Sequence, residues 1–177
     1  EKEVNAIPKV NIKSMVSNSD YVLKNGSVKI TYTFESNRLD DINRIVVNSI
    51  SYPVKKLSSS KYEVEVLAGS VSGPYSLKTT QIVYVDGVTV DVDATLNVNI
   101  LKDEPFINNY KLTDNLDKGT VTLDFDVVDK DESLKNIYAV LDGEKLDDQI
   151  NKGHNTLTLK VTPSKKYLFD IKATYDL

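Results

Sequence analysis

Few residues of this sequence have side chains that could do chemistry, and they lie far apart. His154 is the only histidine, so a hydrolytic triad or a zinc site built on it lacks its partners. We expect His154 to be a solvent-exposed residue of the loop Asn151–His154. The run Ser58–Lys61 has the Ser-x-x-Lys spacing of serine acyl-transfer enzymes, but that chemistry places the serine at a helix start, and this run precedes a predicted strand. We therefore expect no catalytic residue and a protein that is not an enzyme.

The densest acidic group is the one candidate metal site. It lies at the exit of a predicted strand and consists of Asp126, Asp129, Asp131 and Glu132. Calcium prefers several oxygen ligands from one or two loops, and sandwich modules often bind it at their ends. However, the spacing is not that of an EF-hand loop, and Lys130 lies inside the group. A solvated acidic turn is the favoured interpretation, with calcium as the alternative and no other cofactor expected.

The ten tyrosines, four phenylalanines and no tryptophan raise the question of a sugar-binding platform, which favours exposed aromatic rings. Three tyrosines fall at alternating positions typical of a core: Tyr32, Tyr62 and Tyr84. Three others are expected to be exposed: Tyr21, Tyr52 and Tyr110. Singly exposed rings are common on protein surfaces, so a dedicated platform is not the favoured interpretation.

Composition excludes several kinds of partner. Of the 177 residues, 40% are hydrophobic and 27% are charged, as in ordinary globular chains. The net charge of −4 argues against nucleic acid, and the mixed charges form no basic patch for direct membrane contact. No apolar run is long enough to span a membrane, and the absence of cysteine excludes disulfides. The sequence starts at Glu1 without a methionine, so we expect an excerpt or a processed product.

The alternation from Val88 to Ile100 organises the chain. Every even position is apolar and every odd position polar, which predicts a long strand with one buried face. Asp86-Gly87 before it is a hairpin turn signal, and the segment Leu101–Pro105 after it is typical of a linker. The sequence therefore predicts two domains, 1–102 and 103–177.

The remaining pattern is that of an all-β protein. Residues 1–8 are expected to be a polar lead-in and residues 36–41 a polar loop. Besides the strand from Val88 to Ile100, strands are predicted at 10–16, 27–35, 42–47, 50–54, 61–68, 75–85, 106–113, 120–128, 137–141, 144–146, 155–161 and 167–175. Pro53 should confine its strand to a sheet edge, because proline cannot donate a ladder hydrogen bond.

The two halves repeat one pattern. Asn25-Gly26-Ser27-Val28 matches Lys118-Gly119-Thr120-Val121, and later strands correspond in the same order. A period of roughly 90 residues with short strands is the size of an immunoglobulin-like β-sandwich. We predict two tandem immunoglobulin-like modules, the second of which lacks its closing strand, so that a sheet edge is left open or covered by a neighbour.

The segments Ile45–Asn48, Tyr52–Val54 and Lys61–Val66, with Tyr138–Gly143 and Ala173–Asp176, resemble the β-sandwich repeats of Gram-positive surface proteins. Such repeats occur in adhesins and in the non-catalytic regions of zinc metalloproteases of the IgA1-protease type, whose His-Glu-x-x-His motif is absent here. The resemblance implies an extracellular or secreted spacer module of a bacterial protein, attached to the cell wall through other parts. A module that binds a host glycan or an extracellular protein is the alternative.

Overall fold

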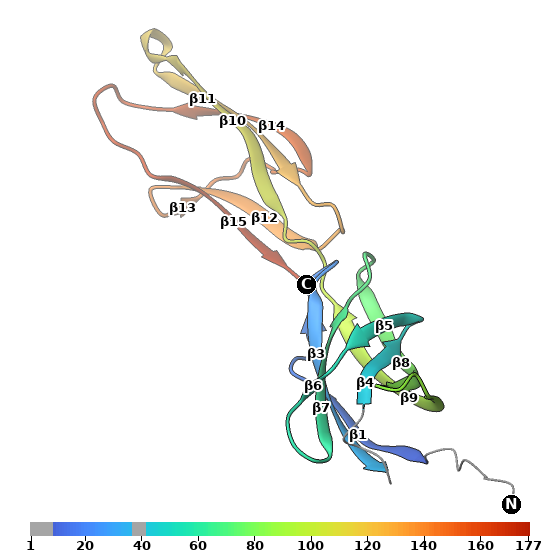
Figure 1. Cartoon of the computed structure of the whole chain (residues 1–177). Coiled ribbons are helices and arrows are strands. Elements are labelled where there is room, and N and C mark those ends of the chain that lie inside the picture. The colour runs from blue at the N-terminus through green and yellow to red at the C-terminus, as the bar shows by residue number, and fades with distance from the viewer. Residues whose placement is uncertain (1–8, 37–41) are drawn as a thin grey trace, which may run out of the picture. The chain divides into compact units, whose positions relative to one another are not determined.

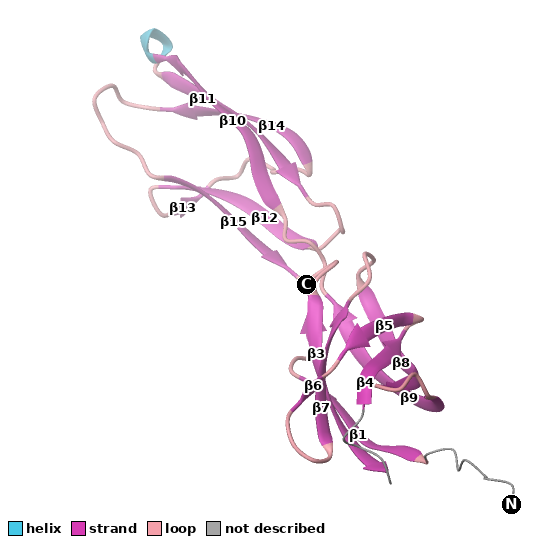
Figure 2. Ribbon diagram, viewed as in Figure 1, coloured by secondary structure: helices cyan, strands magenta, loops and turns pink. Residues whose placement is uncertain are grey.

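The computed structural model describes residues 9–36 and 42–177, and almost all of its regular structure is β-strand (Figure 2). The lead-in expected at 1–8 and most of the loop expected at 36–41 lie outside the described residues. The all-β fold expected from the sequence is confirmed. No helix in the described part of the chain is long and apolar enough to cross a membrane.

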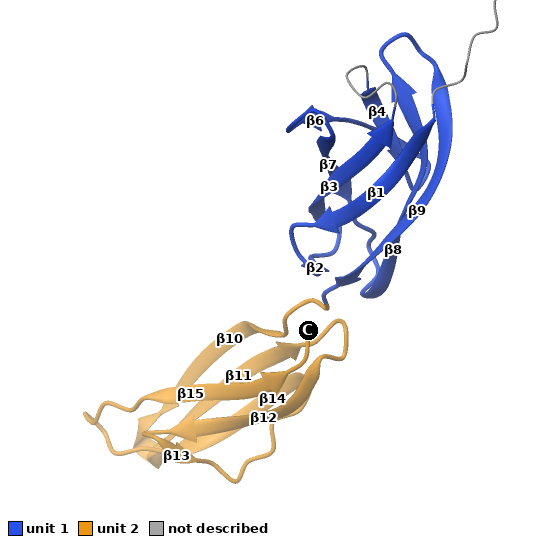
Figure 3. Cartoon of the chain, turned by 90° about the horizontal axis from the view of Figure 1, so that it is seen from below, with its two compact units in different colours: residues 1–101 blue, residues 102–177 orange. Residues whose placement is uncertain are grey.

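The chain divides into two compact units, Glu1–Leu101 and Lys102–Leu177 (Figure 3). Each described core draws its side chains from one unit only. Ile100 ends the last strand of unit 1 and Phe106 begins the first strand of unit 2.

Unit 1 is a sandwich of two sheets (Figure 1). One sheet has the order β1-β3-β7-β6, with strands Val10–Ser17, Ser27–Ser36, Lys61–Leu67 and Lys55–Lys56. The other has the order β2-β9-β8-β4-β5, with strands Tyr21–Val22, Thr89–Ile100, Gly73–Tyr84, Ile42–Val47 and Ile50–Pro53. As the sequence predicts, the strand that carries Pro53 lies at a sheet edge.

The core of unit 1 follows from the alternation in its strands. In β3, Val28, Ile30, Tyr32 and Phe34 are buried and point to one face, because successive side chains of a strand point to opposite sides. The ring of Phe34 stacks on that of Tyr32 at a centroid distance of 5.5 Å. The Tyr32 hydroxyl and the Thr79 hydroxyl share a buried hydrogen bond of 2.6 Å, which satisfies both polar groups inside the core.

Unit 2 repeats this arrangement with fewer strands. One sheet has the order β10-β11-β14, with strands Phe106–Asn115, Thr120–Val128 and Gly153–Lys160. The other has the order β13-β12-β15, with strands Glu144–Lys145, Leu134–Leu141 and Phe169–Tyr175. The turn expected at Asp117–Gly119 is the 3₁₀ helix η1 (Leu116–Lys118), closed by Gly119 at φ 66°, a left-handed conformation that glycine adopts without strain.

Unit 2 contains no strand that corresponds to β9. Its last strand, β15, pairs with β12 on one side and is the edge of its sheet. The core consists mainly of Leu123 and Phe125 from β11, with Leu157 and Leu159 from β14, packed on Ala139 of β12.

Candidate functional site

The structure places His154 differently from the sequence-based expectation. His154 is exposed, as predicted, but it lies in strand β14 and not in a loop, directly opposite Asp126 of β11. Its Nδ1 is 2.8 Å from Asp126 Oδ1, and its Nε2 is 3.3 Å from Asp124 Oδ1. The amide of Asn109 donates to Asp126 at 2.7 Å, and the hydroxyl of Thr156 donates to Asp124 at 2.6 Å.

These contacts shift the two ionisation equilibria in opposite directions. The hydrogen bond from Asn109 and the one with His154 lower the pKa of Asp126. The hydrogen bond to Asp126 has the largest effect on the pKa of His154 and raises it. Desolvation lowers this pKa, while the charge of Asp126 and the contact with Asp124 raise it, so that the net shift is upward. The carboxylates therefore favour the imidazolium, which cannot accept a proton as a general base. This polar group, which we call the His154 cluster, is a cross-strand charge pairing on an exposed sheet face.

Asp129 has a separate, structural environment. Its carboxylate is fully buried and accepts hydrogen bonds from the backbone N–H groups of Ser133 and Leu134 and from the Ser133 hydroxyl, at 2.9 to 3.1 Å. The ammonium of Lys152 lies 3.0 Å from its Oδ2. Burial alone would raise the pKa of Asp129, but Lys152 and the Ser133 and Leu134 donors outweigh burial and lower it strongly.

The four acidic residues of the calcium hypothesis engage different partners. Asp126 belongs to the His154 cluster, and Asp129 holds its own loop. Asp131 accepts a hydrogen bond of 2.6 Å from the backbone N–H of Asp103, while Glu132 is exposed with φ at 53°. Within residues 9–36 and 42–177, no group of three or more His, Cys, Asp or Glu side chains is arranged to hold a metal ion. A cation at Asp129 would have to displace the ammonium of Lys152.

The Ser58–Lys61 run is a hairpin connection. The backbone N–H groups of Leu57 and Ser58 donate to the carbonyl of Lys61, which begins β7. No helix begins at Ser58, so the position that serine acyl transfer requires is not formed there.

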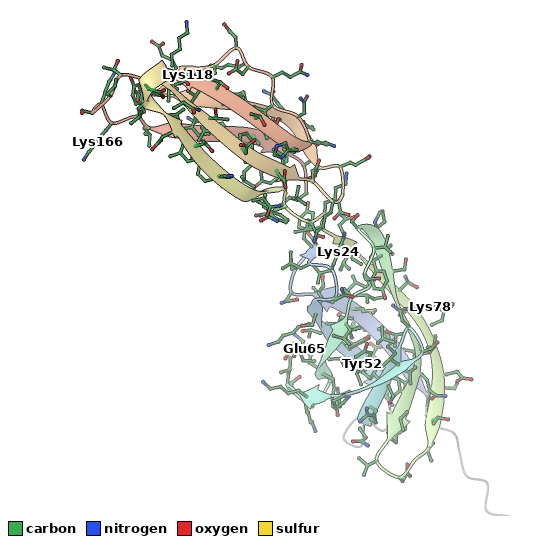
Figure 4. The ribbon with its side chains drawn as sticks, turned by 90° about the horizontal axis from the view of Figure 1, so that it is seen from above. Lys24, Tyr52, Glu65, Lys78, Lys118 and Lys166 are labelled. Carbon is green, nitrogen blue, oxygen red and sulfur yellow. The ribbon has the colours of Figure 1, made fainter. Side chains whose placement is uncertain are left out.

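The tyrosines divide between core and surface. Tyr32, Tyr62 and Tyr84 are buried as predicted, and Tyr21 and Tyr110 are exposed as predicted. The prediction of an exposed Tyr52 is wrong: its ring lies inside unit 1 with 8% of its surface exposed, and its hydroxyl accepts a hydrogen bond from the Leu67 N–H (Figure 4). Tyr52 pairs with Ile45, whose side chain is fully buried, and this pairing directs the ring inward.

Sequence reasoning missed Asp124, Asn109, Thr156 and Lys152 as partners of the acidic residues. The outward positions of β11 and β14 carry the signal for two of them, because antiparallel neighbours place Asp124 opposite Thr156. The contact of Lys152 with Asp129 has no such sequence signal, because it joins two loops, where no strand pairing fixes which residues lie opposite each other.

Comparisons with known proteins add little to this geometry. No known family model matches the chain, and no curated protein sequence matches it. Among solved structures, the chain is similar to dimeric latent PorU from Porphyromonas gingivalis, with 12% sequence identity and a TM-score of 0.33. The similarity covers 94% of this chain and 17% of the PorU chain.

Proposed function

We propose that this chain is a pair of non-catalytic structural modules, a spacer within a bacterial cell-surface or secreted protein. The observation that supports this proposal is the repeat itself. The strand pairings β1-β3-β7 and β8-β4-β5 of unit 1 recur in unit 2 as β10-β11-β14 and β15-β12-β13. Each unit has its own hydrophobic core, as expected of modules used in series.

The particular setting belongs to the same proposal. The resemblance to repeats of Gram-positive adhesins and IgA1-protease-type enzymes supports an extracellular location, with attachment to the cell wall through parts outside these residues. In that setting the connection 101–105, which ends in Pro105, limits the number of backbone conformations between the modules.

Binding to arrayed host glycans and extracellular-matrix proteins, measured with and without calcium, tests the spacer proposal. A spacer gives no saturable binding to any ligand in either condition. Saturable binding to one class of ligand would contradict it, and calcium dependence of that binding would direct attention to Asp126–Glu132.

The second proposed function is a binding module for a host glycan or an extracellular protein. Exposed apolar side chains along β10 favour it, among them Phe106 and Tyr110, because a concentration of such side chains is typical of interaction surfaces. If the array gives a ligand, the double variant Phe106→Ser, Tyr110→Ser should lose it, and the matched variant Tyr21→Ser in unit 1 should retain it.

A further inference from the structure

Unit 2 lacks a strand that its counterpart has, and the site of that strand is open. Taken in chain order, β10, β11, β12, β13, β14 and β15 match β1, β3, β4, β5, β7 and β8. In unit 1, β9 pairs antiparallel with β8 along nearly its whole length and also packs against β1. Residues 102–177, all of which are described, provide no such strand between β15 and β10.

Burial shows the consequence of this missing strand. In β8, which β9 covers, Leu77, Ile82 and Tyr84 are fully buried. In β15, Phe169 and Ile171 are only half-buried, and Ala173 and Tyr175 are exposed. The interior face of β15 therefore lies partly open, in contrast to that of β8.

The opposite margin of the opening is equally apolar. Phe106, Ile107, Tyr110 and Leu112 of β10 each expose 40% or more of their surface. For an edge strand this is unusual, since soluble proteins commonly protect such edges with charges or prolines.

Two hollows follow one another along these strands. One of about 220 Å³ is lined by Phe106 and Ile107 of β10 and by Ile171 and Tyr175 of β15, with Val127 among its other apolar walls. The second, also about 220 Å³, is lined by Tyr110 and Leu112 of β10 and by Phe169 of β15, with Leu123 and Leu159 of the core. We call these two hollows, together with the strands that line them, the β10–β15 groove.

The combination of apolar walls and a strand edge restricts what can fill the groove. The side of β15 away from β12 makes no ladder within the described residues, so its backbone N–H and C=O groups are available for pairing. An added strand satisfies these groups and buries alternate side chains in the hollows at the same time, as in β-strand addition. A sugar or a lipid chain would not satisfy a row of alternating donors and acceptors.

The strand β9 of unit 1 indicates which side chains a segment bound in the groove should carry. Val90, Val92, Leu96, Val98 and Ile100 of β9 pack against its core, and polar residues alternate with them on the outer face. We infer that the β10–β15 groove binds an extended polypeptide segment from outside residues 1–177, which carries aliphatic side chains at alternate positions and runs antiparallel to β15. This inference goes beyond the spacer role and does not depend on it.

A synthetic peptide with the sequence of residues 88–101 is the probe. It is titrated into the 177-residue chain while backbone amide NMR signals are followed, beside a peptide of the same composition without the apolar–polar alternation. We expect saturable shifts of the β15 and β10 amides with the first peptide and none with the second. The β8 amides of unit 1, which β9 already covers, serve as an internal control and should not shift.

Ala173→Lys tests the location of binding. Ala173 lines one hollow and is exposed, so a lysine can lie in solvent when the groove is empty but obstructs an incoming strand. This variant should weaken peptide binding by about tenfold or more, whereas Thr174→Lys on the opposite face should bind like the parent. Circular dichroism and the unperturbed amide spectrum verify that both variants are folded.

Three results would overturn the inference. The first is that the β15 amide signals do not shift even at the highest soluble peptide concentration. The second is that both peptides bind equally well. The third is concentration-dependent dimerisation that perturbs the β15 amides without peptide, which would assign the edge to a second copy of the chain. The glycan and matrix array measures binding of different ligands, so failure of the spacer proposal there and failure of peptide binding here are distinguishable.

Discussion

At the scale of single residues, neighbouring carboxylates of one acidic stretch have unlike roles. Asp126 lies on an exposed sheet face beside an imidazole, while Asp129, three positions later, is buried with every contact a donor. The difference comes from the end of β11 at Val128, after which the chain turns back over its own backbone N–H groups. This acidic stretch therefore contains one carboxylate that pairs with an imidazole on the surface, Asp126, and one that binds backbone N–H groups inside its own loop, Asp129.

Asp129→Asn should destabilise unit 2 by about 2 kcal/mol, because in either orientation the new amide N–H₂ faces a backbone N–H of Ser133 or Leu134, which can only donate. Chemical denaturation followed by circular dichroism measures this loss, and Asp148→Asn, at an exposed position, is the matched control. Because the pKa of Asp129 is lowered in the folded state, its contribution is present above the unfolded value of about 3.8 and is lost as pH falls toward the folded value. An Asp129→Asn variant as stable as the control would contradict this assignment.

The His154 cluster gives a prediction with the opposite sign. The folded-state pKa of His154 is raised above 6.5, so its pairing is fully present below that pH and is lost as pH rises through the folded-state pKa. NMR titration of the ring protons should therefore give a pKa above the ordinary histidine value of 6.5. Asp126→Asn should return it toward 6.5, while Asp170→Asn on β15 should leave it unchanged. A parent value at or below 6.5 would show that the contacts with Asp126 and Asp124 do not form in solution.

At the scale of elements, the same position in two sandwiches has two environments. β8 lies between β9 and β4, whereas β15 has a neighbour on one side only. A strand with one neighbour makes backbone hydrogen bonds on one side only. Its inward-facing side chains also lack a second neighbouring strand that would exclude water from them.

Hydrogen–deuterium exchange should reveal this difference directly. Amides of β15 should exchange at least about tenfold faster than those of β8 in the same molecule, because opening an edge strand breaks fewer contacts. Mass spectrometry of peptides covering 73–84 and 169–175 measures both rates in one sample, and the central strand β11 provides a protected reference within unit 2. Equal protection of β8 and β15 would show that the edge is covered in solution.

Elements also show which features of the fold were predictable. The apolar–polar alternation in β3 and β11 predicts correctly which side chains are buried, because each strand has the core on one side and water or polar contacts on the other. The strands β2 and β6 have two residues each, too few to show a period, and neither was expected. Tyr52 and His154 were misjudged because their positions depend on cross-strand register, which a local pattern does not contain.

At the scale of the whole chain, two cores of different completeness share one polypeptide. Unit 1 buries large side chains such as Tyr32, Phe34 and Tyr84 completely, while unit 2 leaves its groove-lining strands open. Stability rises with the apolar area removed from water, so unit 1 should be the more stable unit. The repeat in sequence therefore does not imply a repeat in stability.

Calorimetry of the whole chain with one core substitution in each unit tests this. Two unfolding transitions are expected, because the described cores share no residue. Ile30→Ala should cost about 3 kcal/mol in the upper transition alone, and Leu157→Ala a comparable amount in the lower one alone, since each removes buried methyl groups. If either substitution displaced a single common transition, the two units would unfold as one cooperative body, and the description as independent modules in series would fail. If Ile30→Ala affected the lower transition instead, unit 1 would be the less stable unit, and the argument from the buried apolar area of the two cores would be wrong.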